Sequence, residues 1–86
     1  MIVFLPSPLY SYTEGANRFE VRGKTVREGL AALDKRFPGI LFRMVDEAGA
    51  LRRHMRIYVD GASDDNLERE VGPASEVHVI AALSGG

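Results

Sequence analysis

The chain has 86 residues, which is enough for one small domain with a thin hydrophobic core. It contains no cysteine, which excludes a disulfide-stapled fold, a thiolate metal site and a cysteine nucleophile. Eleven basic and twelve acidic residues give a net charge of −1, so no basic excess is available for binding a nucleic-acid backbone.

The first third of the chain predicts two strands joined by a loop. Residues 2–5 are β-branched, aromatic or leucine and are followed at once by proline, which is typical of a short buried strand. Residues 6–15 are rich in turn formers, so we predict a loop there. Residues 18–22 alternate charged and apolar side chains, which places Phe19 and Val21 on a buried face. The two strands are expected to pair as an antiparallel hairpin.

The segment 25–37 carries clear helix signals. Thr25 and Glu28 fit a capping box, in which each side chain accepts a hydrogen bond from the main-chain N–H of the other residue. Apolar residues then recur at helical spacing: Val26, Leu30, Leu33 and Phe37. Pro38 and Gly39 end the helix.

The middle of the chain has a more mixed pattern. Residues 40–45 are apolar and fit either a short helical turn or an extended piece. Residues 55–59 alternate as a strand does and are followed by Asp60-Gly61, a dipeptide typical of a hairpin turn. Residues 62–75 are acidic and irregular.

The last predicted strand spans residues 76–83, with Val77, Val79 and Ala81 on one face. Strands before and after a single long helix favour an α+β fold in which one mixed sheet packs on the helix. The start of the chain lacks the basic residues of a signal peptide, and no stretch approaches the roughly 18 apolar residues of a membrane helix. We therefore predict a cytoplasmic protein without a membrane partner.

No catalytic or metal-binding motif is present in the sequence. His54 and His78 are far apart, and neither has a carboxylate at helical ligand spacing, so we predict no metal site. His78 is expected to be a half-exposed surface residue. Asp64, Asp65 and Glu68 lack the register of a calcium loop and favour a solvated acidic face. The sequence therefore predicts neither an enzyme nor a bound cofactor.

Charge is distributed unevenly along the chain. The first 45 residues hold seven basic and four acidic residues, and the remaining residues hold four and eight. An acidic surface around the C-terminus favours a basic pocket on a partner, and chance asymmetry is the alternative. Within this half, Arg52, Arg53, His54 and Arg56 form a basic cluster. On a strand, alternate members share one face, as a binding patch or as an ordinary charged edge.

The sequence ends in Gly85-Gly86. Because glycine has no Cβ, two in succession form the thinnest possible chain, which is able to thread a narrow channel. The terminal carboxylate is ionised at neutral pH and becomes an electrophile only after activation, for instance as an acyl-adenylate. A frayed chain end is the alternative. We predict a domain over residues 1–83 and a flexible tail over residues 84–86.

The order of elements and the tail together resemble the MoaD/ThiS family of ubiquitin-like, β-grasp sulfur carriers, and the resemblance covers essentially the whole chain. It is most specific in residues 76–86, where Glu-Val opens an apolar strand that leads to Gly-Gly. The Pro-Gly-Ile of residues 38–40 and the insert before the Ile-Tyr-Val of residues 57–59 resemble the CysO-like branch. One departure is Ala74-Ser75, where the family has Gly-Asp.

The resemblance implies a carrier protein rather than an enzyme. In the family, an E1-like enzyme uses ATP to adenylate the C-terminal carboxylate, here that of Gly86, and sulfur transfer converts it into a thiocarboxylate. A downstream synthase then uses the sulfur in cysteine, thiamin or molybdopterin biosynthesis. Gly85 and Gly86 match the functional motif. Ile80 and Leu83 are our candidates for partner contact, with core packing as the alternative for Ile80.

Three other functions fit the same features. The chain could be a ubiquitin-like modifier that is joined to lysines of other proteins through Gly86. It could be the small subunit of a molybdopterin synthase, against which the insert at residues 46–53 argues mildly. It could also be a β-grasp interaction module with an inert tail.

Overall fold

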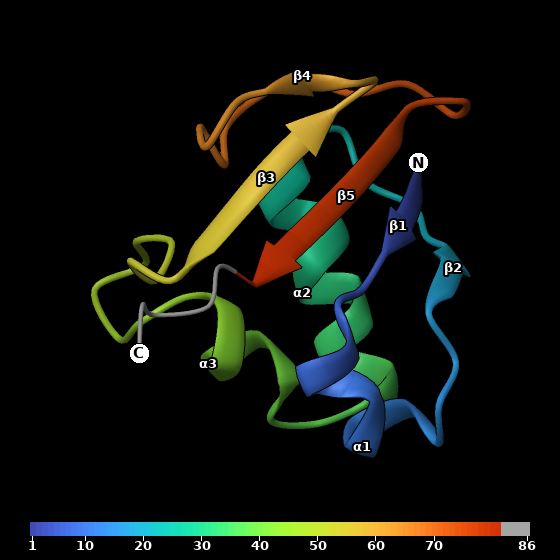
Figure 1. Cartoon of the computed structure of the whole chain (residues 1–86). Coiled ribbons are helices and arrows are strands. Elements are labelled where there is room, and N and C mark those ends of the chain that lie inside the picture. Colours follow the sequence, from blue (N-terminus) through green and yellow to red (C-terminus); the bar gives the residue numbers. More distant parts are fainter. Residues whose placement is uncertain (82–86) are drawn as a thin grey trace.

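A five-stranded mixed sheet forms the centre of the molecule, as seen in a computed structural model that describes residues 1–81 (Figure 1). Its strands are β1 (Ile2–Phe4), β2 (Arg18–Glu20), β3 (Met55–Val59), β4 (Ala62–Ser63) and β5 (Glu76–Ala81). The strand order is β2-β1-β5-β3-β4, in which β1 and β5 run parallel and the other neighbours run antiparallel. The predicted α+β class and the predicted pairing of the first two strands are confirmed.

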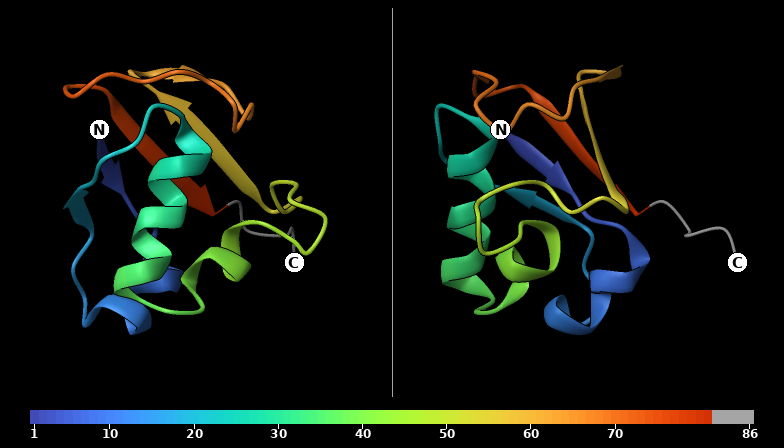
Figure 2. Two further views of the ribbon diagram at one scale, coloured as in Figure 1. Left: turned by 180° about the vertical axis from the view of Figure 1, so that it is seen from behind. Right: turned by 90° about the vertical axis from the view of Figure 1, so that its left-hand side faces the viewer.

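Helix α2 (Val26–Arg36) packs along one face of this sheet (Figure 2). The Thr25 hydroxyl accepts a hydrogen bond from the main-chain N–H of Glu28 at 3.2 Å, as the capping box predicts. The Glu28 carboxylate, however, accepts from the main-chain N–H of Lys24 at 2.8 Å rather than from that of Thr25. Half of the predicted box is confirmed, and the other half is shifted by one residue.

Residues 40–45, which fitted either a helical turn or an extended piece, form mainly a short helix, α3 (Ile40–Met44). The chain enters it through Gly39, whose φ of 100° lies in the region that glycine adopts without strain. The Asp34 carboxylate in α2 accepts hydrogen bonds from the N–H groups of Gly39 at 3.0 Å and Leu41 at 3.1 Å. Asp34 therefore fixes α3 against the end of α2.

Residues 6–15 are not the loop that their turn formers predict. They contain a 3-10 helix (Ser7–Leu9) followed by helix α1 (Tyr10–Thr13). Proline is tolerated in the first turn of a helix, where its missing N–H has no partner to lose. Leu9 is buried and attaches this segment to the core.

The predicted hairpin turn at Asp60-Gly61 is confirmed. Both residues have positive φ, 50° and 87°, as a type I′ turn requires. The turn joins β3 to β4, and Val59 pairs with Ala62 across it. Strand β4 is a short ordered element within a stretch that the sequence predicts to be irregular.

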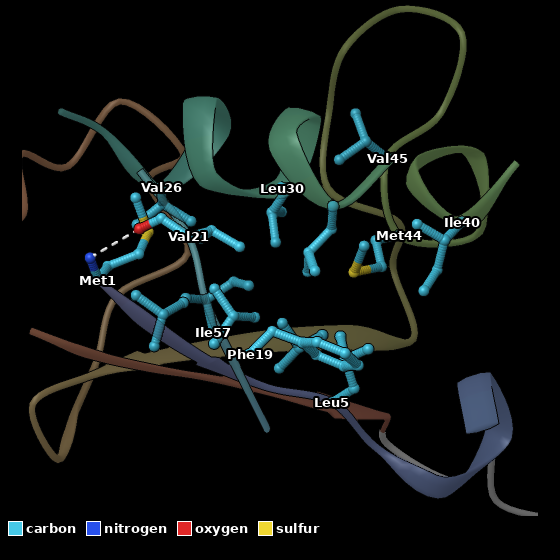
Figure 3. Close-up of a cluster of buried hydrophobic side chains, with 14 of the residues drawn as sticks. Met1, Leu5, Phe19, Val21, Val26, Leu30, Ile40, Met44, Val45 and Ile57 are labelled. Carbon is cyan, nitrogen blue, oxygen red and sulfur yellow. Dashed lines mark hydrogen bonds between the residues drawn. The ribbon is translucent and has the colours of Figure 1, made fainter. Parts of the chain in front are cut away.

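The hydrophobic core lies between α2 and the inner face of the sheet (Figure 3). The fully buried side chains come from α2, α3 and three strands: Val3, Val26, Leu30, Leu33, Ile40, Met44, Ile57, Val59, Val77 and Val79. Burying one large aliphatic side chain contributes about 1.5–3 kcal/mol. This layer therefore holds β1, β3 and β5 in place behind the open face of the sheet.

Met1 also belongs to this core, and its position explains a glycine in α2. Its ammonium group donates a hydrogen bond to the Val21 carbonyl at 3.0 Å (Figure 3). Its side chain lies over Gly29, where an added Cβ would come within 2.3 Å of the Met1 sulfur. Only glycine at this position allows so close an approach.

The opposite face of the sheet is free of helices in the part of the chain that is described (Figure 2). Alternate side chains of β3 and β5 are exposed there. No helix within residues 1–81 is long and apolar enough to span a membrane.

Candidate functional site at the end of strand β5

Strand β5 leads to the C-terminal glycines through the middle of the sheet. Its last described residue, Ala81, pairs with Met55 at the start of β3. The predicted site residues Leu83, Gly85 and Gly86 lie outside the described residues, as does the predicted domain boundary. The candidate site is therefore the surface around the end of β5, where these residues are attached.

Strand β5 is held by its inner face and at its start. Val77 and Val79 are buried, which confirms the face predicted for them. The main-chain N–H of Glu76 donates to Asp60 Oδ1 at 2.9 Å, and the N–H of Asp60 donates to the Glu76 carbonyl at 2.9 Å. With β1 and β3 bonded on its two sides, β5 forms a firm base for the residues that follow it.

The turn before β5 does not need the glycine that the family has at position 74. The N–H of Ser75 donates to the Gly72 carbonyl at 3.2 Å, and the N–H of Gly72 donates to Ser75 Oγ at 2.9 Å. Ala74 does not have a positive φ. Pro73 presets the φ of about −65° that the first central position of such a turn requires, so alanine is accommodated at the second.

Ile80 is exposed on the open face of the sheet, close to the end of β5. Its exposed fraction is 43%, and it pairs with Arg56 across the β3–β5 ladder. The alternative that Ile80 packs in the core is therefore wrong. Its contact with a partner stays a prediction.

An aromatic row crosses the same face further back along β5. The imidazole of His78 stacks on the ring of Phe4 with centroids 4.3 Å apart and planes 5° apart. Tyr58, which is 39% exposed, pairs with His78 from the other side. The predicted half-exposed position of His78 is confirmed.

The basic cluster lies next to the end of β5 but is not a strand face. Residues 53–54 form a turn ahead of β3, so the expected alternation across residues 52, 54 and 56 is wrong. Arg52 instead turns toward α3. Its Nε donates to the Phe42 carbonyl at 2.7 Å, and its guanidinium lies 4.6 Å from the centroid of the Phe42 ring.

Arg43 reaches the same place from α3. Its Nε donates to the Tyr12 hydroxyl at 2.7 Å, and its guanidinium lies 5.9 Å from the Tyr12 ring centroid. The hydrogen bond to Tyr12 raises the pKa of Arg43 further above its ordinary value. A surface depression of about 280 Å³ is lined by Phe42, Arg43, Arg52 and His54.

The sequence does not predict Phe42 and Arg43 as site residues, although its spacing indicates that Phe42 is exposed. Ile40 and Met44 are buried at i, i+4 spacing on a helix of five residues. The residue midway between them must point the other way, and Phe42 is in fact 58% exposed.

Acidic residues gather in the segment between β3 and β5 (orange in Figure 1), where Asp64 and Asp65 lie beside Ile57 of β3. The Asp64 carboxylate binds the Arg69 guanidinium at 2.9 Å, and this contact holds the pKa of Asp64 below its ordinary value. Asp65 Oδ1 accepts from the main-chain N–H of Ile57 at 2.8 Å. Asp65 Oδ2 also lies 3.9 Å from Nε of Arg56, which pairs with Ile80, so these acidic side chains bind groups of the chain beside β3. Within residues 1–81, no three His, Cys, Asp or Glu side chains gather closely enough to hold a metal ion.

A larger depression of about 670 Å³ lies where β1 begins and is lined by Met1, Arg22, Lys24 and Pro73, among others. Ile2 pairs with Glu76, the first residue of β5, so this depression is at the far end of the strand from Ala81. It does not contribute to the candidate site.

Comparisons with known proteins give matches among solved structures. No protein-family model and no curated protein sequence matches the chain. The chain is similar to CysO in the crystal structure of the Amycolatopsis orientalis BexX/CysO complex, with 31% identity and a TM-score of 0.89 over 99% of this chain and 98% of that one. CysO from Mycobacterium tuberculosis, described as an antigen, has 24% identity and a TM-score of 0.87 over 95% of this chain and 98% of that one.

A third match is SAMP1 from Haloferax volcanii, with 25% identity and a TM-score of 0.78 over 100% of this chain and 98% of that one. The mixed sheet packed on α2 is the β-grasp, ubiquitin-like fold that these proteins share. Identity above 30% over nearly the full length of both chains supports membership of the same family as well as a shared fold. The chain belongs to the MoaD/ThiS-like family of ubiquitin-fold sulfur carriers that includes CysO.

Proposed function

We propose that this protein carries sulfur as a thiocarboxylate on Gly86 after an E1-like enzyme has adenylated the carboxylate of that residue. The proposal is supported by two observations taken together. The chain is 31% identical to CysO over nearly its full length, and its central strand leads directly to a terminal Gly-Gly.

The chemistry needs activation by a partner. A carboxylate oxygen of Gly86 attacks the α-phosphorus of ATP and releases pyrophosphate, which leaves an acyl-adenylate. A sulfide-level sulfur donor then displaces AMP from the carbonyl carbon and leaves the thiocarboxylate. The carrier supplies only the carboxylate, since ATP and the catalytic groups belong to the partner. Because the activation consumes ATP, the proposal places the protein in the cytoplasm.

The covalent length of the tail limits where such a partner binds. Five residues follow Ala81, and an extended chain spans at most about 3.6 Å per residue, or roughly 18 Å in all. An active site that reaches the Gly86 carboxylate must therefore approach the end of β5 closely. On this basis we assign partner contact to Ile80, which is exposed there. We assign the same role to Leu83, two residues after Ala81.

Two classes of partner are expected. The first is the E1-like enzyme, and the second is a synthase that accepts the sulfur. The similar CysO of Amycolatopsis orientalis forms a complex with BexX, which supports a dedicated protein partner for this chain as well.

The proposal is tested with the purified chain, ATP and candidate E1-like enzymes. Carrier-dependent exchange of pyrophosphate into ATP is expected with the correct enzyme, and deletion of Gly86 is expected to abolish it without changing Tm. A matched control is Gly72→Ala, which leaves the tail intact and has room for a Cβ, since its nearest neighbour would be 4.0 Å away. Exchange that survives deletion of Gly86 would exclude the terminus as the reacting group.

A second function, modification of other proteins through Gly86, is favoured by the similarity to SAMP1, a small archaeal modifier protein. The same adenylation serves both functions, so the assay above does not separate them. A ladder of higher-mass conjugates that requires Gly86, detected by immunoblot in cells, indicates a modifier. Its absence together with thiocarboxylate formation indicates a carrier only.

A further inference from the structure

Two guanidinium groups beside the end of β5 are positioned by neutral groups instead of carboxylates. Arg52 is held by the Phe42 carbonyl and ring, and Arg43 is held by the Tyr12 hydroxyl and ring. Both use Nε for this contact. Among the ion pairs found within residues 1–81, none involves either arginine.

With respect to residues 1–81, this arrangement leaves the terminal nitrogens of both arginines open to a ligand. A guanidinium presents donors in a planar fork that matches the two oxygens of a carboxylate. Fixing Nε and stacking the plane on a ring reduces the side-chain freedom that is lost when a ligand binds. The two forks and His54 line one depression of about 280 Å³, with Phe42 as its apolar wall.

The depression is connected to the end of β5 by main-chain hydrogen bonds. Ala81 pairs with Met55, whose N–H donates to the Arg52 carbonyl at 2.9 Å. The N–H of Arg52 in turn donates to the carbonyl of Met44, the last residue of α3, at 2.9 Å. Phe42 and Arg43 belong to the same short helix. The guanidinium groups of Arg43 and Arg52 and the end of β5 at Ala81 therefore belong to one connected surface.

We propose that Arg43 and Arg52, with Phe42 and His54, form a docking site for an acidic segment of the enzyme that acts on the tail. This inference rests on the proposed function, because the short tail brings that enzyme to this surface. Aromatic residues and arginine are enriched at protein interfaces, and arginine is among the residue types that contribute most to binding energy there. Charge complementarity selects an acidic partner segment, because no carboxylate of residues 1–81 neutralises these two arginines.

The first experiment uses the activating enzyme identified by pyrophosphate exchange. The variants are Arg43→Gln, Arg52→Gln and their combination, and the matched control is Arg22→Gln, which removes an exposed arginine at the far end of the sheet. Each single variant is expected to lower kcat/KM for the carrier about tenfold through KM, which corresponds to loss of one interfacial arginine contact. The control is expected to change it less than about twofold.

Salt gives a second readout in the same assay. Raising NaCl from about 50 mM to about 200 mM is expected to lower kcat/KM of the unmodified chain several-fold and that of the double variant little. Arg52→Lys keeps the charge without the fork and is expected to recover part of the loss. Equal losses in Arg22→Gln and Arg52→Gln, or unchanged kcat/KM in both single variants, would overturn the proposal.

A measurement without the enzyme separates this inference from the proposed function. The full chain, labelled with ¹⁵N, is titrated with a tetraglutamate peptide capped at both ends, and the Nε–H resonances of the arginines are followed by NMR. Those of Arg43 and Arg52 are expected to shift in a salt-sensitive way, whereas that of Arg22 stays in place. Uniform shifts at all three would overturn the site. If the arginine resonances respond to the peptide but no candidate E1-like enzyme supports pyrophosphate exchange, only the proposed function is overturned.

The chain's own terminal carboxylate is the competing occupant. The full chain with its Gly86 carboxylate converted to an amide tests it, because removing that charge leaves the arginine resonances unchanged if the site awaits a partner. Movement of the Arg43 and Arg52 resonances on amidation, before any peptide is added, would assign the site to the terminal carboxylate and overturn docking of a partner.

Discussion

The charged side chains near the two ends of β5 have different kinds of partner. At its start and in the segment that follows β4, carboxylates bind groups of the same chain: Asp60 binds the N–H of Glu76, and Asp64 binds Arg69. At its end, Arg43 and Arg52 are held by aromatic rings and neutral oxygens and pair with no carboxylate of residues 1–81. The carboxylates therefore stabilise the fold, whereas the two guanidinium groups stay available to a partner next to the end of β5.

This difference in charge pairing follows from the segments that meet at each end of β5. The start of β5 gathers the beginning of β1, the start of α2 and the long segment after β4. There, Met1 packs on Gly29, and Thr25 bridges to Glu70. Acidic side chains satisfy N–H groups of this irregular backbone. At the end of β5, Arg43 and Arg52 have no carboxylate partner within residues 1–81, which leaves their charges for a partner.

The largest expected effect is at the start of β5. Gly29→Val places a Cβ within 2.3 Å of the Met1 sulfur and two further methyl groups beside it, which forces the core side chain to move. Overpacking of this kind costs about 3 kcal/mol of unfolding free energy, whereas the gain in helix propensity over glycine is roughly 0.5 kcal/mol. Chemical denaturation measures the change. An unchanged unfolding free energy would show that this end is loosely packed and would weaken the contrast between the two ends.

A smaller loss is expected at the hairpin turn. Asp60→Ala removes the acceptor for the N–H of Glu76 and places alanine at a φ of 50°, which together cost about 2 kcal/mol. Asp60→Asn keeps an acceptor and a residue that tolerates this φ, so it is expected to lose much less. Equal unfolding free energies for the two variants would rule out the hydrogen bond as the cause.

The Asp64–Arg69 pair, in the segment that follows β4, predicts a pH effect on stability. Because the folded chain holds the pKa of Asp64 below the ordinary 3.8, its stabilisation is present above that pH and is lost as the pH falls through the folded pKa. The difference in Tm between the unmodified chain and Asp64→Asn is therefore expected to shrink in acid. It should also shrink with added salt, since both side chains are partly exposed. A Tm difference that is constant from neutral to acid pH would contradict this role.

The smallest effect on stability is expected at the other end. Arg52→Gln removes an exposed cation–π contact and one hydrogen bond to a carbonyl, so the unfolding free energy should change by about 1 kcal/mol or less. The same variant is expected to weaken activation strongly. A loss of stability as large as that of Gly29→Val would mean that Arg52 serves the fold and not a partner.

Much of the architecture is predictable because its signals are local. The cap at Thr25 and the apolar spacing define α2, and Asp60-Gly61 defines its turn through the positive φ of both residues. The helical segment within residues 6–15 is missed because Leu9 is buried by a tertiary contact and not by local periodicity.

The candidate site is less predictable than the fold. The glycine pair is visible in the sequence, and Arg52 stands out as part of a basic cluster. The contact of Arg52 with Phe42 spans ten positions and depends on the turn ahead of β3. Pairing Arg43 with Tyr12 joins segments 31 positions apart, so no local pattern indicates it.

The central claim is that Gly86 carries the sulfur, and the mass of the intact chain tests it most directly. The chain is incubated with its activating enzyme, ATP and a sulfide donor, beside a chain that lacks Gly86. The account predicts a mass gain equal to one oxygen replaced by sulfur, located in the C-terminal peptide and absent from the shortened chain. A chain that is adenylated but never gains sulfur, or that gains it elsewhere, would contradict the account.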